Sequence, residues 1–270
     1  MKERFEFPPL LEIIAELRWD VHAPHAAPGA PIPLLPPMLQ PFEESFSELA
    51  GALGNLGFRN SERLIPQGFP WMVHEPVIRF RYSGGAEEQQ PLKKSSLFQV
   101  GAGIFTANAV PPYSSWDDFG PIVREGVEAL FACCFKSGAP EKMAPTLRYI
   151  DAFKELHTSG ASMHKFLSEV MGINISLPDT LNGSGQAMTP QLQIVKPLPF
   201  GRLALQFMDG AVNGEKALIL DMSVHFDGPV AGNPDAVLDA FSRARDEIHR
   251  VFVELTKPIH AVMHPKDGSI

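Results

Sequence analysis

The chain has 270 residues, of which 44% are hydrophobic and 20% charged, and its formal net charge is −8 at pH 7. This balance is typical of a globular protein and excludes wholesale disorder. No cluster of basic residues exceeds Lys93-Lys94, which argues against a broad non-specific DNA-binding surface but leaves room for a local basic groove. No apolar run approaches the roughly 20 residues of a membrane helix, so we expect no membrane partner.

The cysteines indicate the compartment. Cys133 and Cys134 are neighbours in a helical pattern, where a disulfide between them is geometrically poor. Residues 1–7 contain no apolar signal core. We therefore expect a cytoplasmic protein in a reducing environment.

The first predicted strand covers residues 8–19 and has two different faces. Pro8 and Pro9 lack the N–H that a strand ladder needs and mark its start. One face is apolar and contains Leu11, Ile13, Ala15, Leu17 and Trp19. The other face carries three charges, on Glu12, Glu16 and Arg18, which must meet water, pair with other groups or line a cleft.

Elements that follow in the first half alternate between helical and extended patterns. They are a proline-rich link over residues 24–37, a helix over 37–56, a strand over 77–82, a hairpin over 97–110 and a helix that begins at Ser114 or Ser115.

The second half predicts a strand over 146–156, a short helix over 163–171, and strands over 191–196, 203–208 and 216–226. A turn-rich loop covers 181–186, and Asn213-Gly214 is a strong hairpin signal before the last strand. The final helix begins with Asn233 as its cap and Pro234 in its first turn. Strands joined mainly by hairpins predict an α+β fold with mainly antiparallel sheets and helices packed on one face. We expect two α+β subdomains, 1–156 and 157–270, or one compact unit.

Several motifs in this order resemble a bacterial family of uncharacterised proteins of about this length, distributed sporadically among distant genomes. They are the strand motif of residues 8–19, Asn108, the Pro112-Tyr113 and Trp116 motif, and Leu147-Arg148-Tyr149-Ile150-Asp151. Asp151 departs from the asparagine expected after the Leu-Arg-Tyr-Ile run. The resemblance implies no activity. The patchy distribution suggests an accessory or defence-linked role by analogy.

The charged face of the first strand is the strongest candidate site. Arg148 and Asp151 lie on another predicted strand that could sit beside it, which would create a polar cleft that recognises a ligand or partner. A structural ion-pair network or a solvated sheet face is the simpler interpretation of the same pattern. Glu12 and Glu16 are four residues apart, roughly 14 Å along a strand, so they do not form a ready-made catalytic pair.

Asn108, Tyr113 and Trp116 complete the candidate binding set, because they belong to the motifs above. Bases could stack on the aromatic rings, although core packing explains such residues more simply.

Metal and nucleophile signals are weak, and we expect no cofactor. His260 and His264 have helical i,i+4 spacing, but prolines bracket them and no glutamate lies between. His225 and Asp227 fit ordinary surface residues, and Cys134 falls on an apolar stripe. No phosphate loop or serine-nucleophile motif is present.

These observations favour a non-enzymatic binding or accessory protein in a protein complex, in a bacterial defence or toxin–antitoxin-like system. One alternative is an RNA- or DNA-engaging factor that uses Arg79, Arg81 and Arg148. The other is an enzyme with a Glu/Arg/Asp cleft.

Overall fold

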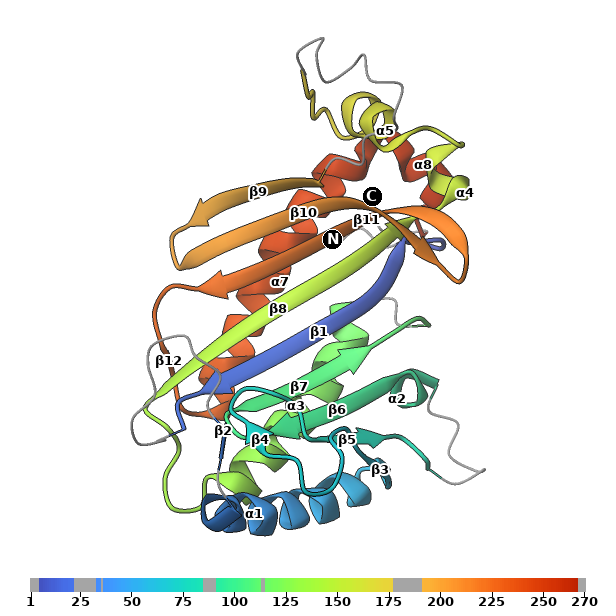
Figure 1. Ribbon diagram of the computed structural model, residues 1–270. Coiled ribbons are helices and arrows are strands. Elements are labelled where there is room, and N and C mark those ends of the chain that lie inside the picture. The colour runs from blue at the N-terminus through green and yellow to red at the C-terminus, as the bar shows by residue number, and fades with distance from the viewer. Residues whose placement is uncertain are drawn as a thin grey trace. The chain divides into compact units, whose positions relative to one another are not determined.

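The computed structural model describes residues 5–21, 33–34, 36–84, 91–112, 115–176 and 191–266 (Figure 1). It confirms the predicted α+β fold, with antiparallel strand pairing and helices. The predicted proline-rich link over 24–37 lies largely outside the described residues, and the loop over 181–186 lies entirely outside them.

The chain forms two compact units, each assembled from separate segments. Unit 1 comprises residues 1–11, 149–224 and 246–270. Unit 2 comprises residues 12–148 and 225–245. Each unit is described by itself below.

Unit 2 contains an antiparallel sheet with hydrogen-bonded strand order β3-β5-β6-β7-β1-β8. The strands are β1 (Leu10–Trp19), β3 (Asn60–Arg63), β5 (Ile78–Arg81), β6 (Ser96–Gly101), β7 (Ile104–Ala109) and β8 (Lys142–Phe153). Two short strands, β2 (Pro33–Leu34) and β4 (Trp71–Met72), pair with each other, and β12 (Val230–Ala231) pairs with β8. The helices are α1 (Pro36–Asn55), α2 (Pro91–Lys94), α3 (Trp116–Cys134) and the first half of α7 (Pro234–Thr256).

The apolar face of this sheet packs against α3, which runs behind β6 and β7 in Figure 1. Alternate residues of β1, namely Ile13, Ala15 and Leu17, are at most 1% exposed. The rings of Phe98 on β6 and Phe105 on β7 stack with centroids 5.6 Å apart. The predicted two-faced strand and the predicted hairpin are therefore confirmed.

Unit 1 combines strands with shorter helices. Its sheet has the strand order β8-β11-β10-β9. It contains the end of β8, then α4 (Glu155–Thr158), α5 (Met163–Glu169), β9 (Gln191–Leu198), β10 (Gly201–Val212), β11 (Glu215–Phe226), the end of α7, a 3-10 helix η1 (Lys257–Ile259) and α8 (His260–Met263). The Asn213-Gly214 turn joins β10 to β11 with φ of 54° and 81°, the left-handed conformations that such tight hairpins require.

Two differences from the predicted elements have local causes. The strand predicted over 146–156 begins earlier, at Lys142, and ends at Phe153, because Glu155–Thr158 forms α4. Strand β3 was not predicted, since all four of its residues are exposed and it has no apolar alternation. Within the described ranges, none of the helices is long and apolar enough to span a membrane.

Gly126 allows α3 to approach the sheet closely. A methyl group at this position would lie 2.3 Å from Cε1 of Phe98, which is fully buried. Gly51 in α1 has nothing within 4 Å of such a methyl group. We expect Gly126→Ala to destabilise the protein by about 1–3 kcal/mol through overpacking. Gly51→Ala, the control, should stabilise it by about 0.5–1 kcal/mol through helix propensity.

Urea unfolding of the two variants against the parent measures both effects. A neutral Gly126→Ala would contradict the close packing of α3 on β6.

Candidate functional site

The registers of unit 2 place a row of polar side chains across five strands. Glu62 on β3 pairs with Arg79 on β5, Arg79 with Gln99 on β6, Gln99 with Thr106 on β7, and Thr106 with Glu16 on β1. Directly paired residues of antiparallel strands point to the same face of a sheet. With strands about 4.8 Å apart, this row spans about 19 Å.

A parallel row lies next to it on the same face. It contains Asn60, Arg81, Leu97, Asn108 and Ile14. Glu12 and Arg18 share this face, because they alternate with the buried residues of β1. We call these two rows together with Glu12, Arg18 and Ile104 the polar face.

Hydrogen bonds organise the middle of the polar face. The Thr106 hydroxyl donates to the side-chain carbonyl oxygen of Asn108 at 2.8 Å. The Asn108 amide nitrogen donates in turn to Oε1 of Glu12, also at 2.8 Å. Thr106 and Asn108 are only 5% and 7% exposed, so these bonds satisfy buried groups and orient the Glu12 carboxylate.

Ion pairs lie toward the ends of the polar face. Nε of Arg18 lies 2.7 Å from Oε1 of Glu16. Glu62 faces two arginines, with Nη1 of Arg79 at 3.3 Å and Nε of Arg81 at 4.0 Å. The Arg18 and Arg81 side chains are 46% and 49% exposed, so each pair contributes only about 0–1 kcal/mol to stability.

Four of the predicted site residues meet on this face, namely Glu12, Glu16, Arg18 and Asn108. Arg148 is exposed on β8, the strand that follows β1 in the sheet order of unit 2. The four residues on β1 and β7 form a polar surface, and their role in binding stays a prediction.

The remaining predicted residues lie elsewhere. Trp116 is the first residue of α3, where its ring packs edge-on against Phe119 at 6.0 Å, which fits the packing interpretation. Tyr113 lies outside the described residues. Asp151 is buried in unit 1.

Polar residues of this face that the predicted site lacked are Asn60, Glu62, Arg79, Arg81, Gln99 and Thr106. Their shared face follows from the pairing of β3, β5, β6 and β7, which no spacing within one strand reveals. Thr106 and Gln99 each alternate with apolar neighbours in their strands, and that alternation is the one signal for them in the sequence.

Asp151 is a buried carboxyl group that is 3% exposed. Its Oδ2 atom has no hydrogen-bond partner among the described residues. Burial, and secondarily the charge of Asp221, raise the pKa of Asp151 to about 8. At neutral pH this carboxyl group is therefore mostly protonated, and it acts as a neutral group of the core.

The other titratable candidates have structural contacts. Oγ1 of Thr256 lies 3.4 Å from Nε2 of His260, and Nδ1 of His264 lies 3.8 Å from a Glu6 carboxylate oxygen. Burial raises the pKa of the half-buried Cys134 thiol to about 12, which disfavours the reactive thiolate. In the part of the chain that the structure describes, no group of three or more histidine, cysteine, aspartate or glutamate residues could hold a metal ion.

Comparisons with known proteins add no relative. No protein-family model, no curated protein and no solved structure matches this chain.

Asn108 connects two side chains of the polar face, so its loss should cost stability. Asn108→Ala leaves the buried Thr106 hydroxyl without its acceptor and Glu12 without its donor. We expect a destabilisation of about 1–3 kcal/mol in urea unfolding. Glu62→Gln, which weakens exposed ion pairs on the same face, should cost less than about 1 kcal/mol. Equal costs for both variants would contradict the hydrogen-bonded chain from Thr106 to Glu12.

Asp151 makes stability dependent on pH. Its pKa in the folded state, about 8, exceeds the usual value of about 4 for an unfolded chain. Between these two pKa values the folded state therefore holds a proton on Asp151 that the unfolded state has lost. The free energy of unfolding consequently falls as pH rises from the lower value to the higher one, by up to about 1.4 kcal/mol per pH unit.

Asp151→Asn keeps the shape and cannot ionise. We expect it to raise the melting temperature at pH 8 more than at pH 5. Asp239→Asn, at an exposed position of α7, should leave the pH profile unchanged. If the melting temperatures of Asp151→Asn and of the parent protein changed with pH in parallel, the raised pKa of Asp151 would be contradicted.

Proposed function

We propose that this chain is a non-enzymatic binding protein whose polar face docks a protein partner. The observation that carries the proposal is the strand register, which brings Glu62, Arg79 and Glu16 into one row across five strands. Paired and half-exposed charges in a fixed geometry suit recognition of a complementary protein surface, where charge complementarity sets specificity and association rate.

The balance of charge favours a protein partner over a nucleic acid. The polar face carries three arginines and three glutamates, namely Arg18, Arg79, Arg81, Glu12, Glu16 and Glu62. A phosphate backbone requires an excess of cations. The apolar residues of the polar face are aliphatic, namely Ile14, Leu97 and Ile104. Sheets that bind single-stranded RNA instead stack bases on aromatic rings.

The contacts of the glutamates favour binding over acid–base catalysis. Glu16 is paired with Arg18, and Glu12 accepts a hydrogen bond from Asn108. Both carboxylates therefore already have a partner on the same face. The wider setting, a bacterial defence or toxin–antitoxin-like system, is proposed from the family resemblance alone.

The proposal is tested by purifying the tagged protein gently from its own host, followed by light scattering, mass spectrometry and an absorbance ratio. The double variant Arg18→Glu/Arg81→Glu reverses two exposed charges of the polar face. Arg124→Glu reverses an exposed charge on α3, away from that face. Thermal melts check that all variants are folded.

We expect one stoichiometric protein partner with the parent and with Arg124→Glu, and its loss from the double variant. A monomer or homodimer with nothing bound would overturn the proposal. Co-eluting nucleic acid that salt removes would favour the nucleic-acid alternative instead.

A further inference from the structure

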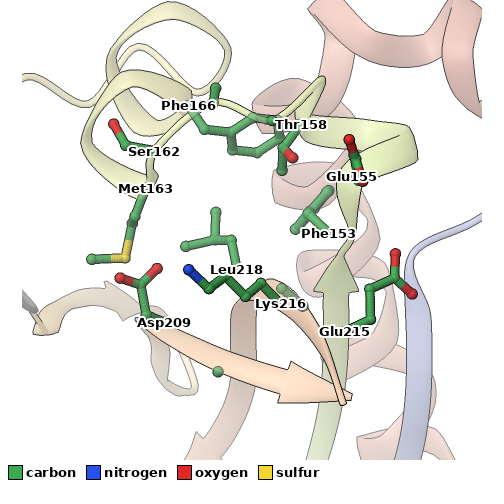
Figure 2. A pocket seen from close by; sticks show the side chains of 14 residues that line it. Phe153, Glu155, Thr158, Ser162, Met163, Phe166, Asp209, Glu215, Lys216 and Leu218 are labelled. Carbon is green, nitrogen blue, oxygen red and sulfur yellow. The ribbon is translucent and has the colours of Figure 1, made fainter. Parts of the chain in front are cut away.

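Unit 1 contains a cavity that is separate from the polar face. Its volume is about 670 Å³, within the range of small-molecule sites. Residues of the α4–α5 segment form one side, and the hairpin of β10 and β11 forms the other (Figure 2). All the lining residues belong to one continuous part of unit 1, residues 149–224.

The floor of the cavity is apolar. The rings of Phe153 and Phe166 pack with centroids 5.3 Å apart. Met163 and Leu218 complete the floor, and all four side chains are at most 6% exposed. Figure 2 shows Leu218 and Met163 between the hairpin and α5. An apolar group that enters here would be removed from water at a gain of about 0.8 kcal/mol per CH₂.

The rim of the cavity has more carboxylates than cations. Glu155, Asp209 and Glu215 line it together with one cation, Lys216. Nζ of Lys154, just outside the lining, lies 3.3 Å from a Glu215 carboxylate oxygen. Figure 2 shows the amine end of Lys216 directed toward the Asp209 carboxylate.

Glu155 is the third carboxylate of the rim, and neither Lys154 nor Lys216 is paired with it. Among the described residues, no ion pair within 4 Å is found for Glu155. The side chain is exposed at the cavity mouth, so it can meet a cationic group of a ligand without a large desolvation cost.

We propose that this cavity binds an amphiphilic amine, with the apolar part on the Phe153–Phe166 floor and the ammonium group at the rim beside Glu155. The apolar floor supplies the affinity, and the excess of carboxylates selects a cation over an anion. This site is independent of the proposed role of the polar face.

Three probes with the same eight-carbon tail separate the contributions of tail and head group. They are n-octylamine, n-octanol and n-octanoate, which are cationic, neutral and anionic at pH 7. Titrations are followed by the methyl NMR signal of Met163, which lines the cavity, with Met72 on β4 as the control signal. We expect octylamine to bind most tightly, octanol less tightly and octanoate least, with shifts at Met163 and none at Met72.

The double variant Glu155→Gln/Asp209→Asn removes two charges at exposed positions. It should weaken octylamine binding roughly tenfold and leave octanol binding unchanged. Glu169→Gln on α5, which does not line the cavity, is the control and should bind like the parent. Tighter binding of octanoate, unchanged octylamine binding in the double variant, or no shift at Met163 with any probe would overturn the proposal.

Discussion

The pairing of β1 with β7 is the constraint on which unit 2 depends. Its register places Ala15 opposite Ala107 and Glu16 opposite Thr106. A slip of one residue would turn Glu16 into the core and Ala15 into solvent, because side chains alternate with a period of two. Burial of Ile13, Ala15 and Leu17 therefore fixes the core and, by the same geometry, fixes which charges share the polar face.

The polar face holds its side chains in fixed positions but contributes little to the free energy of unfolding. Its ion pairs are partly exposed, and such pairs contribute about 0–1 kcal/mol each. Thr106 and Asn108 are buried and need partners merely to offset their desolvation. Apolar residues, or polar residues that remain in water, would allow the same fold with a smaller desolvation cost. The proposed recognition of a partner would account for a fixed arrangement of Arg18, Glu16 and Glu62.

Residue patterns within single segments predicted most of the elements. The alternation over residues 8–19 predicted β1 and its two faces, and Asn213-Gly214 predicted the β10–β11 hairpin. Strand β3 escaped prediction because it has no buried residue. The row of side chains from Glu62 to Glu16 was also not predicted, because it depends on the order of strands that are distant in the sequence. Asp151 was predicted at the polar cleft, but its strand buries it in unit 1.

The two proposed sites use charge differently, and the difference follows from their construction. On the polar face each carboxylate is held by a neighbour, as Glu16 is by Arg18 and Glu12 by Asn108, so specificity comes from a fixed pattern. At the cavity of unit 1 the rim keeps an exposed carboxylate, Glu155, above an apolar floor. Added salt would screen that exposed charge strongly, whereas burial of the apolar tail would persist. A ligand at the cavity would therefore lose its preference for a cationic head group at high salt before it lost its affinity.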